Sequence, residues 1–324
     1  ISWSGSWDFE WMSQTMAREK IIIDTDPGQD DAVAILLALA SPDELEMLGI
    51  TAVAGNAPLH MTEVNARKIC ELAGRPDVKV FAGCDMPIYR ELHTAPEVHG
   101  PTGLNGPILP EPAMPLQPGH AVDWIVDTVM AHEPGTITLV PVGPLTNIAR
   151  ALMKESRLAA RLKRIVIMGG AQLEGGNSSP VAEFNIYVDP HAADIVFRCG
   201  APITVFSLDV THQVLTAPRY MDRLAALGTP VAAATIQMLD YYRQYDQKKY
   251  GTDGGPLHDP CTIAWLIRPE LFTGKAVNVE VEVSSPLTMG QTVMDRWGVT
   301  GRPMNADWMM TADADGFWDL LIER

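Results

Sequence analysis

Near the N-terminus, three apolar residues lead directly into a cluster of acids, in the segment Ile21-Ile22-Ile23-Asp24-Thr25-Asp26-Pro27-Gly28-Gln29-Asp30-Asp31. Four carboxylates fall within eight residues, immediately before an apolar helical pattern. Such crowding is costly because like charges a few ångströms apart repel. Ca²⁺ and Mg²⁺ relieve it, since both prefer carboxylate oxygens. Open α/β sheets hold ligands at the carboxyl ends of parallel strands, so the segment predicts a metal site where a first strand ends.

The rest of the chain alternates apolar, β-branched stretches with helical patterns. This order predicts an α/β fold with a doubly wound, mainly parallel, Rossmann-like sheet flanked by helices. We expect strands at 20–24, 45–54, 78–82, 137–142, 164–168 and 203–208. We expect helices at 30–40, 61–73, 121–132, 145–153, 191–198 and 261–267. The segment 277–283 alternates and predicts an added C-terminal strand that pairs with 290–297.

Two further stretches have a distinct character. Residues 87–118 are rich in Pro and Gly, which predicts a long irregular loop of the kind that usually serves a function. Residues 217–239 form an Ala-rich helical pattern that continues through a cluster of tyrosines.

The chain shows no linker and no repeat, so we expect a single domain over 16–324. We interpret residues 1–15 as an added extension, with Met16 as the true beginning. A packing helix is the alternative, because Trp3, Trp7 and Trp11 recur at helical spacing.

Bulk properties exclude several classes of partner. The 324 residues carry a net charge of -16, which disfavours nucleic acid and anionic membranes, since both require clustered Lys and Arg. No apolar run approaches the about 20 residues of a membrane span. The four cysteines are far apart and form no CxxC pair, which is typical of reduced thiols in a cytoplasmic protein.

Polar or Gly-rich residues follow nearly every predicted strand, and parallel strands bring such residues to one edge of the sheet. Besides the first acidic segment, they are Asn56, Gly143-Pro144, Gly169-Gly170, Asn177, Glu183, Asn185, Asp209, His258 and Asp259. Together they predict a polar pocket that holds a metal and several hydroxyl groups.

These segments carry a resemblance to a known family. The chain resembles the inosine-uridine-preferring nucleoside hydrolases, in family order and over about nine-tenths of its length. The matching segments are Asp24 to Asp31, Val53-Ala54-Gly55-Asn56, His99-Gly100 with Gly103-Leu104, Leu139 to Ile148, Ile167 to Ala171, Ala182-Glu183-Phe184-Asn185, and His258-Asp259.

The resemblance implies an enzyme that cleaves the N-glycosidic bond of a ribonucleoside with water. It implies a Ca²⁺ cofactor, bound by Asp26, Asp31 and Asp259 and by the backbone carbonyl of Val142. Asp26 would also deprotonate the metal-bound water. His258 would sit near the base and assist its departure. The implied partners are a small ribonucleoside and further copies of the chain, as a homodimer or homotetramer.

The remaining implied residues contact the nucleoside. Asp30, Asn56 and Asn185 would bind the 2′- and 3′-hydroxyls, and Asn177 and Glu183 the 5′-hydroxyl. The other implied contacts are Met168 against the sugar, Phe184 in the pocket wall, His99 on the base side, and Tyr241 or Tyr245 over the base.

Structural interpretations stand beside these roles. Asp24 could only orient neighbouring groups. Asp26 and Asp31 could cap a helix N-terminus, and Asn56 could supply a turn. We expect Asn147 to cap the helix that follows Pro144. We expect five other histidines to be solvated or capping: His60, His120, His132, His191 and His212.

Two other functions remain open. One is a Mg²⁺-dependent phosphatase with an aspartyl nucleophile, although the predicted pocket lacks the lysine which that chemistry needs. The other is a protein that binds a nucleoside or ribose without turnover. Base preference is open too, with Val142-Gly143-Pro144 and Gly254-Gly255-Pro256-Leu257-His258-Asp259 favouring pyrimidines.

Overall fold

The computed structural model describes residues 18–251 and 254–324, apart from the side chains at 246 and 250. The expectation for residues 1–15 therefore lies outside the described residues. Within the described part, no helix is long and apolar enough to cross a membrane.

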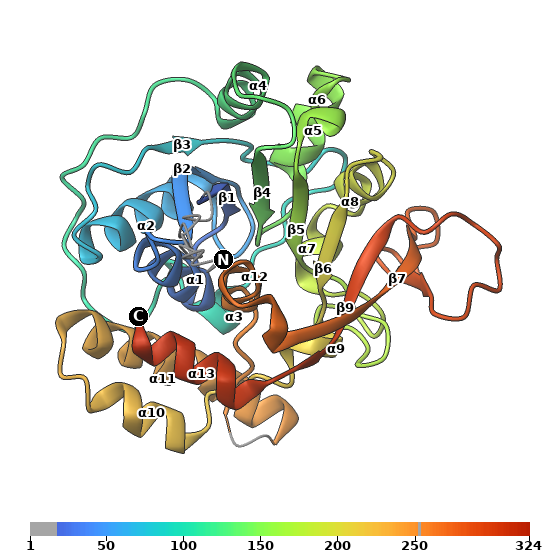
Figure 1. Cartoon of the computed structure of the whole chain (residues 1–324). Coiled ribbons are helices and arrows are strands. Elements are labelled where there is room, and N and C mark those ends of the chain that lie inside the picture. The colour runs from blue at the N-terminus through green and yellow to red at the C-terminus, as the bar shows by residue number, and fades with distance from the viewer. Residues whose placement is uncertain (1–17, 252–253) are drawn as a thin grey trace, which may run out of the picture.

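A sheet of nine strands runs through the described residues in the order β3-β2-β1-β4-β5-β6-β9-β7-β8 (Figure 1). Six neighbouring pairs are parallel, and β7 pairs antiparallel with both β8 and β9. The strands are β1 (Glu19–Thr25), β2 (Leu45–Ala52), β3 (Val80–Ala82), β4 (Ile137–Pro141), β5 (Arg164–Met168), β6 (Ile203–Phe206), β7 (Phe272–Val281), β8 (Thr292–Asp295) and β9 (Ala306–Ala312). The predicted doubly wound, mainly parallel fold is confirmed.

Helices connect the strands and flank the sheet. They are α1 (Gln29–Leu39), α2 (Leu59–Leu72), α3 (Pro96–His99), α4 (Ala121–Ala131), α5 (Thr146–Lys154), α6 (Leu158–Arg161), α7 (Phe184–Val188), α8 (Pro190–Phe197), α9 (Leu208–Thr211), α10 (Pro218–Ala225), α11 (Pro230–Tyr250), α12 (Pro260–Ile267), the 3₁₀ turn η1 (Pro269–Leu271) and α13 (Ala314–Glu323).

Both faces of the sheet are covered, which explains the continuous apolar runs of its strands. On β1, Ile22 packs with α4, α5 and α8 on one face. Its neighbours Ile21 and Ile23 pack with α1, α12 and α13 on the other face (Figure 1). All three isoleucines are fully buried. The first strand is therefore the centre of the core.

The order in which strands are added to the sheet reverses between β1 and β4. From β1 the chain winds through β2 to β3 on one side, and β4, β5 and β6 continue on the other side. Such a reversal opens a crevice beyond the carboxyl ends of the two central strands, where doubly wound folds bind ligands. The acidic segment that follows β1 lies at this position, next to Val142 after β4.

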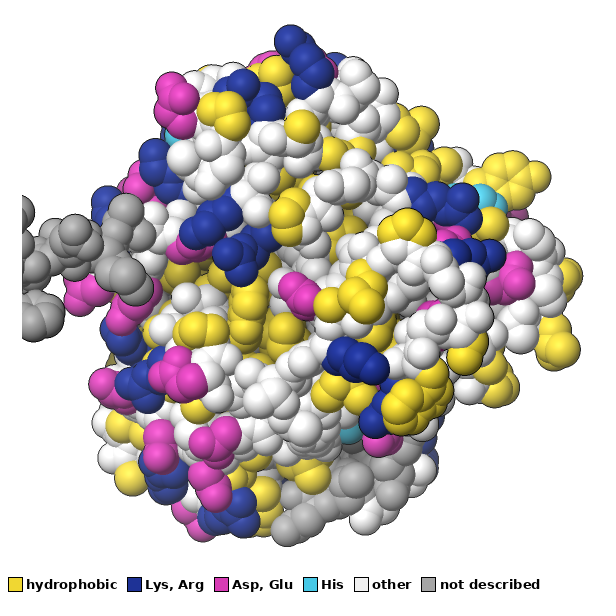
Figure 2. All heavy atoms as spheres, turned by 45° about the vertical axis from the view of Figure 1, so that its right-hand side comes forward, with side chains coloured by type: hydrophobic (Ala, Val, Ile, Leu, Met, Phe, Trp, Pro, Cys, Tyr) yellow, Lys and Arg dark blue, Asp and Glu magenta, His cyan; other side chains and the backbone are white. Residues whose placement is uncertain are grey.

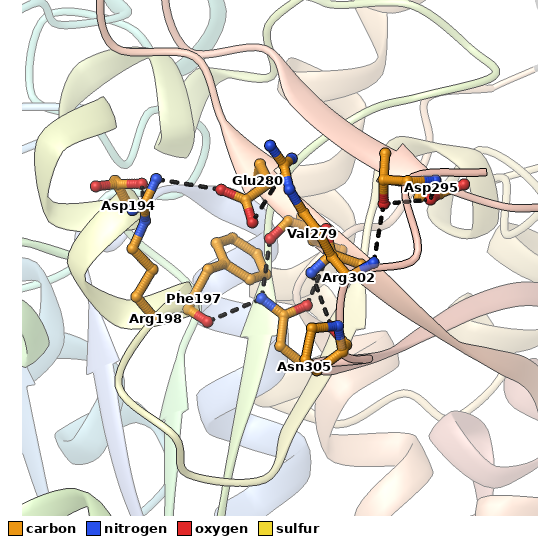
Figure 3. A network of polar contacts seen from close by, with 11 residues as sticks. Asp194, Phe197, Arg198, Val279, Glu280, Asp295, Arg302 and Asn305 are labelled. Atoms are coloured by element: carbon orange, nitrogen blue, oxygen red, sulfur yellow. Dashed lines mark hydrogen bonds and ion pairs between the residues drawn. The ribbon is translucent and has the colours of Figure 1, made fainter. Parts of the chain in front are cut away.

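The C-terminal region differs most from the predicted elements. The predicted strand pair is present as β7 and β8, which run antiparallel. The sequence pattern missed β9, which lies between β6 and β7. Figure 3 shows how Asn305 joins this region to α8. Its Nδ2 donates to the carbonyls of Phe197 and Val279, both at 2.9 Å, and its Oδ1 accepts from the amide of Val279 at 2.8 Å.

The single helix expected from residue 217 onward is wrong, because two helices occupy this stretch. Between α10 and α11 the backbone at Gly228 has a φ of 63°, which ends helical geometry. Thr229 then caps α11 by accepting the amide of Ala232, and Pro230 occupies the first helical position. The expected continuation through the tyrosine cluster is confirmed, since α11 extends to Tyr250.

Charge is mixed on the face shown in Figure 2. Basic side chains are interspersed there with acidic and apolar ones and form no continuous basic surface among the described residues.

Candidate functional site

Three buried carboxylates meet at the end of β1. Those of Asp30, Asp31 and Asp259 have oxygens within 4.8 Å of one another. The first two occupy the first turn of α1, and Asp259 directly precedes α12. Because α1 and α12 pack side by side, segments more than 200 residues apart in the sequence share one site. This donor set can hold a metal ion.

Asp26 lies fully buried beside this group. Its Oδ2 accepts the amide of Asn56 at 2.6 Å, and its Oδ1 has no hydrogen-bond partner among the described residues. A Cβ on Gly55 would lie 2.0 Å from Oδ2, and one on Gly143 would lie 2.4 Å from Oδ1. The glycines that follow β2 and β4 therefore make room for this carboxylate.

Asp31 has a structural role as well as a place in the acidic group. Its Oδ2 accepts the amide of Gly28 at 2.9 Å, as a capping residue of α1 does. It also accepts the Thr25 hydroxyl and, at 3.2 Å, the Nδ2 of Asn56. Asp26 does not cap the helix, because its bound amide belongs to the turn after β2.

The electrostatics of the group favour a cation. Burial raises the pKa of Asp26 well above its ordinary value, and the charge of Asp31 raises it further. Burial likewise raises the pKa of Asp259 well above its ordinary value, with further contributions from Asp30, Asp31 and Asp26. Carboxylates in such a setting take up protons or bind a cation. The unpartnered Oδ1 of Asp26 fits the second possibility.

A cavity of about 250 Å³ opens beside the acids. Most of the residues that the sequence assigned to the substrate or the metal line it. They are Asp30, Asp31, Asn56, His99, Val142, Met168, Asn177, Glu183, Phe184, Asn185, Tyr245, His258 and Asp259. Of the assigned residues, all within the described ranges, Asp26 and Tyr241 do not line the cavity. Asp26 lies behind its wall.

One side of the cavity is formed by the start of α7. Glu183 caps this helix, accepting the amides of Asn185 at 2.9 Å and Ile186 at 3.2 Å, and it also accepts the amide of Gly170 at 2.9 Å. Burial raises the pKa of Glu183 to about 7, although these hydrogen bonds oppose the shift. The Nδ2 of Asn185 donates to the carbonyl of Val142 at 2.7 Å, which fixes the carbonyl expected to bind the metal.

Two neighbouring histidines, His258 and His212, line another part of the cavity, and the sequence pattern indicated only the first. His258 pairs through Nδ1 with the Thr211 hydroxyl at 2.7 Å, and burial lowers its pKa well below the ordinary value. The ring of His212 lies 5.6 Å from that of His258, and its Nδ1 is 3.4 Å from a carboxylate oxygen of Glu174. His212 is the C-terminal cap residue of α9, within the expected range of roles, but it also lines the cavity, which the sequence pattern did not indicate. His120 does cap α4, as expected.

The tyrosines of α11 that line the cavity differ by one residue from the expectation. Tyr242 and Tyr245 line the cavity together with Lys249, whereas Tyr241 does not. The three lining residues recur at i, i+3 and i+7 and therefore share one face of α11. That spacing is the signal that could have identified them. His93, in the long loop, also lines the cavity, and no sequence pattern pointed to it.

Asp24 and Asn147 form a buried hydrogen-bonded pair next to the site but do not line its cavity. Asp24 accepts the Thr51 hydroxyl at 2.5 Å and the Nδ2 of Asn147 at 2.7 Å. Burial raises the pKa of Asp24 to about 7, which these two hydrogen bonds oppose. Asn147 also donates to the carbonyl of Ala52 and accepts the amide of Cys84, so the predicted capping role is wrong. It joins three strand ends instead.

Comparisons with known proteins agree with this geometry. Residues 21–319 match the model of the family described as inosine-uridine preferring nucleoside hydrolase. An uncharacterized protein of Schizosaccharomyces pombe is 52% identical over 305 residues, with 94% of this chain and 98% of its own covered. A pyrimidine-specific ribonucleoside hydrolase of Photobacterium profundum is 47% identical over 305 residues, with 94% and 97% covered.

A solved structure agrees over the same length. A purine-preferring ribonucleoside hydrolase from Gardnerella vaginalis superposes with a TM-score of 0.88 at 34% identity, with 94% of this chain and 97% of its own covered. The sequence comparisons and the structural superposition thus indicate the same family across nearly the whole chain. The chain belongs to the inosine-uridine preferring nucleoside hydrolase family, and it is a ribonucleoside hydrolase, as the resemblance in its sequence indicated.

Proposed function

We propose that this chain hydrolyses the N-glycosidic bond of ribonucleosides with Ca²⁺ as its cofactor and Asp26 as the general base. One observation carries the proposal: the buried carboxylates of Asp30, Asp31 and Asp259 line one side of a cavity, and the buried carboxylate of Asp26 lies behind that wall. Uncompensated, such a cluster is costly. A hard divalent cation with oxygen ligands offsets that cost.

The residues that would hold the ion are Asp26, Asp31 and Asp259, with the carbonyl of Val142. When bound, Ca²⁺ would orient the sugar hydroxyls and lower the pKa of the attacking water. Asp30 would bind the sugar diol from the cavity wall, beside Asn56 and Asn185.

Asp26 is suited to accept a proton from the attacking water. Its Oδ1 accepts no hydrogen bond among the described residues, so an oxygen lone pair is available for that proton. Its oxygens are confined between the turns after β2 and β4, so the carboxylate cannot rotate freely. A general base in such a position contributes about 10²–10⁴-fold to a rate.

The sugar develops positive charge as the bond to the base breaks, as in other glycoside hydrolyses. The nearby carboxylates and amide oxygens stabilise that charge. We assign the 5′-hydroxyl to Asn177 and Glu183, and the faces of the sugar to Met168 and Phe184. All four line the cavity.

On the leaving-group side, His258 would assist departure of the base, with Thr211 fixing the orientation of its ring. His99 and Tyr245 would contact the base. Tyr242, rather than Tyr241, would contact the base as well, since it lies in the cavity wall.

We propose pyrimidine ribonucleosides as the preferred substrates. The pyrimidine-specific relative is 47% identical to this chain, against 34% for the purine-preferring enzyme of known structure. The higher identity supports the same base preference here.

We further propose a cytoplasmic homo-oligomer, a dimer or a tetramer. Four free cysteines support a reducing compartment. Two large exposed apolar side chains beyond β8 support self-association, since Trp297 is 78% and Val299 is 83% exposed. Light scattering coupled to size exclusion tests the oligomer, and a monomer at micromolar concentration would contradict it.

A substrate panel tests the function. Uridine, cytidine, inosine and adenosine are assayed for release of free base, with and without a chelator. We expect the fastest release from the pyrimidine nucleosides and none after chelation. Binding without turnover would instead support a nucleoside-binding protein, and phosphate release from a sugar phosphate would support the phosphatase.

A further inference from the structure

One uncharged side chain lies in the middle of the acidic segment. Gln29 is fully buried at the start of α1, and its amide group lies against His99, 70 residues away. The Nε2 of Gln29 lies 3.1 Å from the carbonyl oxygen of His99 and 2.9 Å from that of Asn105. Its Oε1 lies 2.7 Å from Nδ1 of the His99 ring.

This geometry fixes the orientation of the amide. A carbonyl oxygen can only accept hydrogen bonds, so the end of Gln29 that faces two carbonyls must be the NH₂ group. The other end is then the amide oxygen, which is also only an acceptor. The ring nitrogen that faces it must therefore carry a proton. The assignment follows from heavy-atom positions alone and does not depend on placed hydrogens.

His99 has little freedom to adopt another state. Burial lowers the pKa of its ring to about 3, so the ring is neutral and carries a single N–H. A Cβ on Gly28 would lie 2.3 Å from Nδ1, which shows how closely the backbone approaches this side of the ring. The ring of Tyr242 lies 5.7 Å from that of His99. Among the described residues, Gln29 provides the one hydrogen bond of the His99 ring.

We propose that Gln29 is a positioning residue that holds His99 in the tautomer protonated at Nδ1, so that Nε2 presents a lone pair to the cavity and selects a leaving base with an N–H on the facing edge. The inference rests on the proposed function for its substrate, since His99 lines the nucleoside cavity. The tautomer itself does not depend on catalysis.

A hydrogen-bond acceptor in the buried cavity wall distinguishes bases that carry an N–H donor from bases that lack one. Uracil carries an N–H at N3, whereas 3-methyluracil carries a methyl group there and cannot donate. A site built to form a hydrogen bond disfavours a substrate that lacks the donor, because its own polar group is left unpaired. We therefore expect wild-type enzyme to prefer uridine over 3-methyluridine in kcat/KM.

The first test is spectroscopic. In protein labelled with ¹⁵N-histidine, long-range ¹H–¹⁵N correlation reports which ring nitrogen carries the proton, and the His99→Asn variant identifies the signal. We expect a protonated, pyrrole-type Nδ1 and a pyridine-type Nε2 at neutral pH. A pyrrole-type Nε2 in the wild-type protein would overturn the inference, whether or not the protein hydrolyses any nucleoside.

The second test compares Gln29→Met with Asn65→Ala. Asn65 donates to the carbonyls of Pro27 at 3.1 Å and Thr102 at 2.9 Å. It therefore fixes the same loop to the same turn but has no contact with the His99 ring. A purely structural role of Gln29 predicts equal effects of the two substitutions. The proposal predicts a change in substrate selection for Gln29→Met alone.

We expect Gln29→Met to lower the preference for uridine over 3-methyluridine by about tenfold, the equivalent of one hydrogen bond. We expect Asn65→Ala to leave that ratio within about twofold of wild type, with any loss shared by both substrates. An unchanged ratio in Gln29→Met would overturn the selective role. If that variant does not fold, the wild-type spectrum still decides the tautomer. Absence of hydrolysis by the wild type would contradict the proposed function, not the tautomer.

Discussion

The base of the cavity and its rim are assembled in different ways. The base comes mainly from one continuous segment, in which Asp30 and Asp31 begin α1 shortly after β1 ends, while Asp26 lies behind the cavity wall. The rim combines α11 with the 171–183 loop, which meet where Lys249 donates to the carbonyl of Asn177 at 2.9 Å. Local spacing therefore determines the chemistry at the base, whereas tertiary packing determines which side chains reach the rim.

Metal removal should produce the largest effect. We expect a chelator to abolish hydrolysis, because the donors at the base repel one another without a cation. Added Ca²⁺ should restore the rate, measured as release of free base from uridine. Full activity in the presence of the chelator would contradict the metal dependence of hydrolysis.

Asp26→Asn should lower kcat by about 10²–10⁴-fold, because a general base is lost. The matched control is Asp24→Asn, two residues earlier in the sequence and equally buried. Since Asp24 contacts Thr51 and Asn147 outside the cavity, we expect its variant to keep kcat within about tenfold of wild type while melting at a lower temperature. Equal losses of kcat would mean that Asp26 acts only through structure.

At the rim, Tyr245→Phe should have a smaller effect, about tenfold or less in kcat/KM, because one hydroxyl contact to the base is removed. Tyr241→Phe is the control on the same helix, and it should stay within about twofold since Tyr241 does not line the cavity. A larger loss for Tyr241 would reverse our assignment of the face of α11.

The pH dependence of stability offers a further contrast. Burial raises the pKa of both Asp24 and Glu183 to about 7. The folded state thus binds these protons more tightly than the unfolded chain does, so stability is greatest at low pH and falls as pH rises through about 7. We expect the Tm of chelator-treated protein to fall between about pH 5 and about pH 8, measured by differential scanning fluorimetry. A rising Tm would contradict this.

The smallest effect on activity is expected far from the cavity. Asn305→Ala removes three hydrogen bonds that join β7 and β9 to α8 (Figure 3). We expect a loss of about 1–3 kcal/mol in the free energy of unfolding, measured by urea denaturation, because buried groups are left unpaired. kcat/KM should stay within about twofold.

The difference between base and rim also explains how far the sequence could be interpreted. The doubly wound sheet was predictable because its strands are apolar runs between helical patterns. The strand β9 was not, because its sequence Ala306-Asp307-Trp308-Met309-Met310-Thr311-Ala312 shows no regular alternation. Only pairing with β6 and β7 identifies it.

The same limit applies within the site. The acids of the first segment were found from their spacing alone. The roles that the sequence pattern missed depend on partners that are distant in sequence. Asn147 contacts Asp24 across 123 positions, and His212 lies beside His258. Helical spacing could have identified Tyr242, but nothing local indicates that His93 faces the cavity.

The two glycines around Asp26 have a consequence for anyone who redesigns this enzyme. A methyl group at either position would collide with the carboxylate, so Gly55 and Gly143 leave no room for variation. The face of α11, by contrast, carries side chains that are exchangeable without moving the acids. Libraries aimed at new nucleosides should therefore randomise that helix face and leave both glycines untouched.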